Sequence, residues 1–231
     1  MNKIKLFALT VFLTVFIFSD SYSQNMTGKG AYLASLEYNA TFNMGQASDY
    51  LSTPGFWGGS MEIKSFVQKN ISFGILIGNN VISEEQENGS TEVKNGTITG
   101  PQARFINYAP VMATVGYFFN KGKSKTVPYI QANIGSYYVQ QRLQVGANII
   151  DNDNWHFGIG PQVGVLFNVG QNVAIVLDAR YNYAFSSGEP IGNTDNNSYS
   201  FINANIGLAY TLNSPKFLYK KGRLFTVCLF F

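Results

Sequence analysis

Between residues 32 and 212 the chain alternates apolar and polar residues with a period of two. In the clearest case, aromatic and aliphatic residues alternate with glycine and polar residues: Trp155, Phe157 and Ile159 against His156, Gly158 and Gly160. This pattern indicates β-strands with one apolar face. Eight segments show it: 32–42, 58–68, 71–82, 102–119, 128–143, 155–168, 173–185 and 198–212. Each is at least about ten residues long, which is what a tilted strand needs to cross a bilayer.

The two faces of these predicted strands differ in bulk as well as in polarity. The apolar face carries most of the aromatic residues and almost no charge, whereas the opposite face is rich in Gly, Ser, Asn and Gln. An eight-stranded barrel has a lumen just wide enough for side chains to fill it. We therefore expect the bulky face to contact lipid and the polar face to fill the lumen. The predicted fold is all-β, an eight-stranded antiparallel up-and-down transmembrane β-barrel, and a soluble β-sandwich with an aromatic core is the alternative.

The connections between the predicted strands alternate between short and long. The long ones are 44–57, 83–99, 145–154 and 186–197, and they carry nine acidic residues against one base, Lys94. The short-turn side carries nine bases and no acid: Lys29, Lys69, Lys121, Lys123, Lys125, Lys216, Lys220, Lys221 and Arg223. In outer-membrane barrels the short turns are periplasmic and the long loops extracellular. The pattern therefore predicts acidic extracellular loops and a basic ring at the inner leaflet.

Six charged residues lie on the inward phase of the predicted strands: Glu37, Glu62, Asp178, Lys64, Arg104 and Arg180. Because an unpaired buried charge is strongly destabilising, three acids and three bases favour a salt-bridged cluster that plugs the lumen. A structural role is the prediction for these residues, and a path for ions or substrate is the alternative. Arg142 lies on the outward phase near the long-loop end, where it could reach lipid headgroups.

Composition and the N-terminus agree with export to a membrane. Charged residues make up 13% of the chain, against about 25% in typical soluble domains. A net charge of +3 gives no basic footprint for nucleic acid. Lys3 and Lys5 precede the apolar stretch 6–18, which predicts a signal peptide over residues 1–23. The barrel then occupies 24–212, and residues 213–231, which contain the lone Cys228, form a periplasmic tail.

Motifs for chemistry are mostly absent from the sequence. It contains no GxSxG, HExxH, Walker A or CxxC pattern. The single histidine, His156, lies on the inward phase, where a hydrogen-bonded lumen residue is the expected role. We therefore expect no enzyme activity, no catalytic or metal site and no cofactor.

The outward stripes resemble those of the small eight-stranded outer-membrane barrels of OmpA/OmpX type. The resemblance covers residues 30–212 and includes two segments, Pro128-Tyr129-Ile130…Gly135-Ser136-Tyr137-Tyr138 and Gly158-Ile159-Gly160-Pro161-Gln162-Val163-Gly164. It implies a monomer in the outer membrane of a Gram-negative cell. The implied partners are outer-membrane lipid including lipopolysaccharide, the barrel-insertion machinery and an extracellular partner bound through the loops.

The same resemblance implies a structural or surface-interaction role. A porin-like barrel that transports small solutes is the alternative function. A lipid-modifying barrel enzyme is a further alternative, because such enzymes occur among the barrels of this type.

Overall fold

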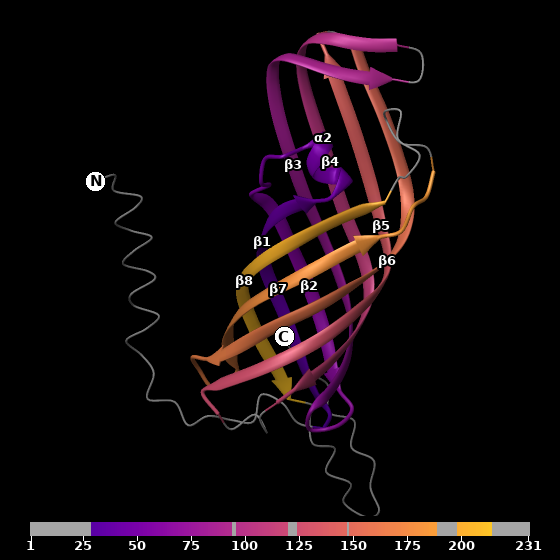
Figure 1. Cartoon of the computed structure of the whole chain (residues 1–231). Coiled ribbons are helices and arrows are strands. Elements are labelled where there is room, and N and C mark those ends of the chain that lie inside the picture. Colours follow the sequence, from indigo (N-terminus) through magenta and orange to yellow (C-terminus); the bar gives the residue numbers. More distant parts are fainter. Residues whose placement is uncertain (1–28, 94–95, 120–123, 147, 189–197, 214–231) are drawn as a thin grey trace, which may run out of the picture.

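Eight antiparallel strands form a closed ring in which each strand pairs with its sequence neighbours and β8 pairs with β1 (Figure 1). The computed structural model describes residues 29–93, 96–119, 124–146, 148–188 and 198–213. The strands are β1 (Ala31–Met44), β2 (Trp57–Phe66), β3 (Ile71–Val93), β4 (Gly96–Phe118), β5 (Thr126–Val145), β6 (Asn148–Asn168), β7 (Val173–Ala184) and β8 (Tyr199–Asn213), and a short helix, α2 (Gln46–Tyr50), follows β1. The predicted eight-stranded antiparallel barrel is confirmed. The predicted signal peptide, 1–23, and residues 214–231 of the predicted tail lie outside the described residues.

Exposure alternates along each strand as the sequence pattern predicts. On β1, Leu36 is 65% exposed, whereas its neighbours Ser35 and Glu37 are 5% and 6% exposed. Every strand contributes large exposed apolar side chains to the outside, and we call this surface the apolar belt. One representative from each strand is Leu36, Ile63, Ile75, Val115, Ile134, Ile159, Leu177 and Leu208. The predicted assignment of apolar residues to the outside and polar residues to the inside therefore holds within the belt.

Four strands continue well beyond the belt at the end where long loops were expected. The β3–β4 ladder runs up to the pair Val93–Gly96, and the β5–β6 ladder runs up to Val145–Asn148. The paired row Ser83–Phe105–Arg142–Asp151 and the residues beyond it form what we call the projecting sheet, which comprises residues 83–93, 96–105, 142–145 and 148–151. Figure 1 shows these strands rising past β7 and β8.

The expectation that 83–99 and 145–154 are loops is thus wrong. Both segments are rich in polar residues and lack the regular apolar alternation by which a strand is recognised. Backbone hydrogen bonds extend the ladder irrespective of that pattern. Of the other two predicted loops, 44–57 contains α2, and most of 186–197 lies outside the described residues.

The lumen is not filled by polar side chains alone, as was expected. Two apolar clusters lie inside it, one at each end, with a polar layer between them. The cluster at the short-turn end contains Leu33, Phe66, Phe118, Val127, Tyr129, Leu166 and Val176. The cluster at the sheet end contains Leu51, Leu76, Ile82, Ile106, Tyr108, Met112, Tyr137, Tyr199 and Phe201. The charged residues that fill the lumen are therefore concentrated in the middle of the barrel, with Arg104 as the exception near the sheet end.

Inward-facing glycines make room for the inward aromatic rings. Tyr129 is paired with Gly164, and a Cβ atom at Gly164 would lie only 2.6 Å from the Tyr129 ring. Likewise a Cβ at Gly158 would lie 2.6 Å from the ring of Tyr137. The alternating glycines of β6 thus serve as space for neighbouring tyrosines, which explains why a narrow lumen holds several large side chains.

Helix α2 closes the lumen at the sheet end. Gly45, whose φ of +57° suits glycine, turns the chain from β1 into the helix. Ala47 and Leu51 are buried in the apolar cluster at the sheet end, and Tyr50 packs against that cluster. No helix in the described part of the chain has the length and apolar character needed to span a membrane.

Candidate functional site

The six charged residues predicted to face the lumen are all buried, with exposed fractions of at most 9%. Five of them gather in the polar layer, where Glu37 lies within electrostatic range of Glu62, Lys64, Asp178 and Arg180. Arg104 lies elsewhere, near the sheet end. The cluster therefore holds three acids and two bases, rather than the balanced set of six that the sequence suggested.

Hydrogen bonds and one ion pair hold most of this cluster in place. The Nζ atom of Lys64 lies 2.9 Å from Oε2 of Glu62, and Gln131 donates a hydrogen bond to Oε1 of Glu62 at 2.9 Å. Asp178 accepts hydrogen bonds from Asn205 at 2.6 Å and from the hydroxyl of Tyr129 at 2.9 Å. The cluster is thus linked to β2, β5, β7 and β8 at once.

Arg180 is the exception within the cluster. Its side chain is completely buried, and none of its three guanidinium nitrogens makes a hydrogen bond to the described residues. Its charge nevertheless acts on Glu37 and Asp178. Arg180 therefore offsets the excess of carboxylates through electrostatic attraction rather than through a directed bond.

Above the charged cluster lies a network of amides. Asn39 donates to Asn80 at 3.0 Å, and Asn182 donates to Asn203 at 2.7 Å. The hydroxyl of Tyr137 donates to Asn182 at 2.9 Å. Asn203 also donates to Asn80 at 3.2 Å, which joins side chains of β1, β3, β5, β7 and β8 into one network across the lumen.

Arg104 belongs to the junction between the lumen and helix α2. Its guanidinium donates to the backbone oxygen of Tyr50 at 3.1 Å and to Oε1 of Gln102 at 3.2 Å. It also lies 5.3 Å from the centre of the Tyr50 ring. Arg104 therefore holds the short helix over the sheet end of the lumen.

The projecting sheet is the other distinctive surface of the molecule. It carries the acids Glu84, Glu85 and Glu87 on β3 and Asp151 on β6. Arg142 is the base beside Asp151, and its Nε lies 2.6 Å from a carboxylate oxygen of Asp151. Arg142 is thus engaged in an exposed ion pair within the sheet.

Glu84 links the projecting sheet to the segment that follows α2. It accepts a hydrogen bond from the side chain of Gln86 at 2.8 Å and from the backbone N–H of Ser52 at 3.0 Å. These bonds, that from Gln86 first, favour the charged form and lower the pKa of Glu84 below its ordinary value. Thr53 donates to the backbone oxygen of Ser83 nearby, at 3.2 Å.

His156 lies inside the barrel, as expected. Its Nδ1 is 2.8 Å from the backbone oxygen of Phe185, and its ring meets the ring of Tyr199 edge to face. Among the described residues no group of three or more His, Cys, Asp and Glu side chains is arranged to hold a metal ion. The contacts of His156 are those of a residue that packs the lumen wall.

No protein-family model and no curated protein sequence matches this chain. Among solved structures it is similar to Ail, the attachment invasion locus protein of Yersinia pestis, crystallised with the heparin analogue sucrose octasulfate. That match has 12% identity and a TM-score of 0.51, and it covers 80% of this chain and 99% of Ail. Neisserial surface protein A is similar with 16% identity and a TM-score of 0.53, over 79% of this chain and 99% of that protein. At these identities the likeness establishes the fold.

Proposed function

We propose that this chain is an outer-membrane β-barrel that is exported by residues 1–23 and held in the bilayer by the apolar belt. The observation behind the proposal is the exposure of large apolar side chains on all eight strands. In water such a surface would drive association, whereas in a bilayer it contacts hydrocarbon. The closed ring also pairs each strand with two neighbours and leaves no open sheet edge, as a membrane interior requires. By the usual orientation the projecting sheet is extracellular and the short turns are periplasmic.

Fractionation of cells that express the full chain tests this placement. We expect the protein in the outer-membrane fraction, extracted only by detergent, with a heat-dependent mobility on gels. Recovery as a compact monomer in the aqueous fraction would contradict the proposal.

Within the membrane placement, the proposed role is contact with an extracellular partner through the projecting sheet. The sheet extends beyond the belt on four strands and presents Glu85 and Glu87 as exposed side chains. An acidic surface attracts cationic partners and repels anionic ones. We therefore expect a basic polypeptide to bind here, in contrast to the sulfated ligand that was crystallised with Ail.

Binding to the protein in nanodiscs of zwitterionic lipid tests this role. Polylysine should bind, and its affinity should fall when salt is added. Sucrose octasulfate should not bind. Glu87→Gln should weaken the binding of polylysine, and Asp49→Asn serves as the control because Asp49 is an exposed acid on α2, outside the sheet. Equal losses in both variants, or tight binding of sucrose octasulfate, would contradict a role for the sheet.

A barrel that transports small solutes would need an open path. The two apolar clusters and the amide network across the lumen support a closed barrel instead. We expect no steady current in planar bilayers, and steady pore currents would favour the transport alternative. A lipid-modifying role would predict that His156→Ala alters lipid profiles, and we expect none to change.

A further inference from the structure

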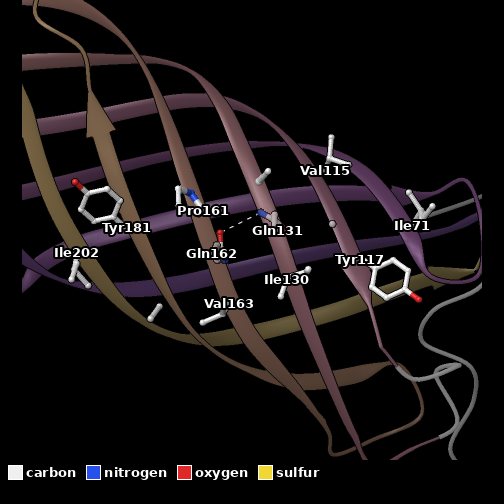
Figure 2. A pocket seen from close by; sticks show the side chains of 13 residues that line it. Ile71, Val115, Tyr117, Ile130, Gln131, Pro161, Gln162, Val163, Tyr181 and Ile202 are labelled. Atoms are coloured by element: carbon white, nitrogen blue, oxygen red, sulfur yellow. Dashed lines mark hydrogen bonds between the residues drawn. The ribbon is translucent and has the colours of Figure 1, made fainter.

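The outer wall of the barrel contains a groove among the lipid-facing side chains. Its volume is about 710 Å³, and its exposed lining is almost entirely apolar. Figure 2 shows the lining side chains running from Ile71 and Tyr117 at one end to Tyr181 and Ile202 at the other. Ile71 begins β3 directly after the β2–β3 turn, so the groove starts at the short-turn end.

The groove is hollow because small outward residues lie side by side in its middle. Ala132 on β5 pairs with Pro161 on β6. Ala179 on β7 pairs with Val163, which lies two residues after Pro161 on β6. Pro161 has no N–H to give to a ladder. The β6–β7 pairing accordingly stops at Ile159–Tyr183 and resumes at Gln162–Arg180. The small side chains and the interrupted pairing at Pro161 therefore account for the depression in the outer wall.

A second hollow adjoins the lower end of the groove. It has a volume of about 490 Å³ and is lined by polar residues of the β2–β3 turn, among them Lys69 and Asn70, together with Lys29. Lys29 is held beside this turn because the N–H of the next residue, Gly30, donates to the backbone oxygen of Phe66 at 2.8 Å. Two ammonium groups and no acid line this hollow, so it suits an anion.

The two hollows lie next to each other on the outer wall. Ile71 and Tyr117 line both of them. Tyr117 is 44% exposed and meets the exposed ring of Phe119 edge to face on the outer wall at the short-turn end. Such rings lie at the boundary between headgroups and hydrocarbon. The basic hollow is thus at headgroup level, and the apolar groove extends from it into the hydrocarbon.

We infer that this composite site binds one anionic glycerophospholipid of the inner leaflet. Its phosphate lies between Lys29 and Lys69, and its acyl chains occupy the groove over Ala132, Pro161 and Ala179. The basic hollow at headgroup level matches the phosphate of a phospholipid, and the apolar groove that extends from it matches the acyl chains. The inference requires the barrel to lie in a bilayer, but it does not require the projecting sheet to bind a partner.

Native mass spectrometry of the full mature chain tests the inference. The folded barrel is released from detergent after equilibration with equal amounts of phosphatidylglycerol and phosphatidylcholine. We expect one phosphatidylglycerol to be retained in preference to phosphatidylcholine. A lysine near an anionic lipid surface contributes about fivefold in affinity, so Lys29→Gln with Lys69→Gln should reduce the preference by about 25-fold.

Two further variants separate headgroup from chain. Ala179→Phe fills the groove and should lower the retention of both lipids while leaving the preference for phosphatidylglycerol unchanged. Lys125→Gln removes a base from the neighbouring β4–β5 turn, outside both hollows, and should change neither quantity. Heat-dependent gel mobility verifies that each variant is folded, and Lys69→Gln alone, with about a fivefold effect, replaces the double variant if that fails to fold.

Several outcomes would overturn the inference. Equal retention of the two lipids by the unaltered chain would exclude a charged headgroup site. If Lys125→Gln had as large an effect as Lys69→Gln, the preference for phosphatidylglycerol would come from general attraction by a basic surface and not from this site. Displacement of the bound lipid by glycerol 3-phosphate at the same concentration would show a phosphate site without a chain groove, whereas failure to displace it supports the composite site.

Discussion

The lower and upper parts of β3 experience different surroundings, although one hydrogen-bonded ladder runs through both. In the lower part, Ile75 and Ile77 face outward, while Leu76 between them is completely buried in the lumen. In the upper part, Glu84 and Gln86 alternate with Glu85 and Glu87, so both faces are polar. The pairing with β4 continues, with a single register shift between Gln86 and Gly89. Backbone pairing therefore sets the length of the strand, whereas the surroundings set its side chains.

The lumen and the projecting sheet each contain an ion pair, and the difference in exposure between these two pairs gives the largest expected effect. Lys64 and Glu62 form a pair whose side chains are 4% and 1% exposed, and Arg142 and Asp151 form one whose side chains are 43% and 44% exposed. Lys64→Met would leave three buried carboxylates facing Arg180 alone. Because an uncompensated buried charge is costly, we expect a loss of about 3–5 kcal/mol in the free energy of unfolding.

Arg142→Met is the matched control for that change. It removes an exposed pair in the projecting sheet, where solvent already screens both charges, so urea unfolding in lipid vesicles should hardly change. A loss of similar size in both variants would show that the polar layer of the lumen is as hydrated as the sheet.

A charge placed on the outward face sharpens the same comparison. Ile134 lies in the apolar belt on β5 and is 51% exposed, and Gln140 lies on the same face six residues further along. Ile134→Arg should cost about 2–4 kcal/mol of unfolding free energy in vesicles, since the guanidinium would lie in hydrocarbon. Gln140→Arg should cost at most about 1 kcal/mol, because it lies near or beyond the membrane boundary. If the two variants lost equal stability, the belt would not mark the position of the bilayer.

The barrel and its faces could be predicted from the sequence because strand parity is local information. Tyr129 and Tyr137 even lie on the inward phase of their segment, so parity placed these rings in the lumen. What the sequence did not show is that such large rings fit inside an eight-stranded barrel, whose average lumen is narrow. The space for them comes from particular glycines that lie across the ladder, such as Gly164.

Register is the information that the sequence pattern lacks. Parity assigns Arg104 to the inside correctly, but its height along the barrel follows from its pairing with Glu84 and Leu143. That pairing places it beside α2 and away from Glu37 and Asp178. The projecting sheet was missed for a related reason, since the residues of β3 that point to either face there, such as Glu84 and Glu85, are polar and give no apolar alternation.

The smallest expected effect concerns the contact between Glu84 and the segment after α2. The folded-state pKa of Glu84 is lower than its ordinary value of 4.5, so its contribution is fully present above that value. The contribution is lost as the pH falls through the lower, folded-state pKa. Glu84→Gln should therefore speed hydrogen exchange in residues 46–56 at pH 7, by less than about fivefold because the group is largely exposed.

As the pH falls below 4.5 and through the folded-state pKa, the difference between Glu84→Gln and the unaltered chain should shrink, because the protonated carboxyl resembles the amide. Glu85→Gln is the control at each pH: Glu85 is adjacent on the strand but points to the opposite face of the sheet, away from Ser52. Hydrogen exchange measured by mass spectrometry on peptides covering 46–56 gives the comparison. If Glu85→Gln had the same effect, the acidic character of the sheet as a whole, rather than the bond to Ser52, would hold this segment in place.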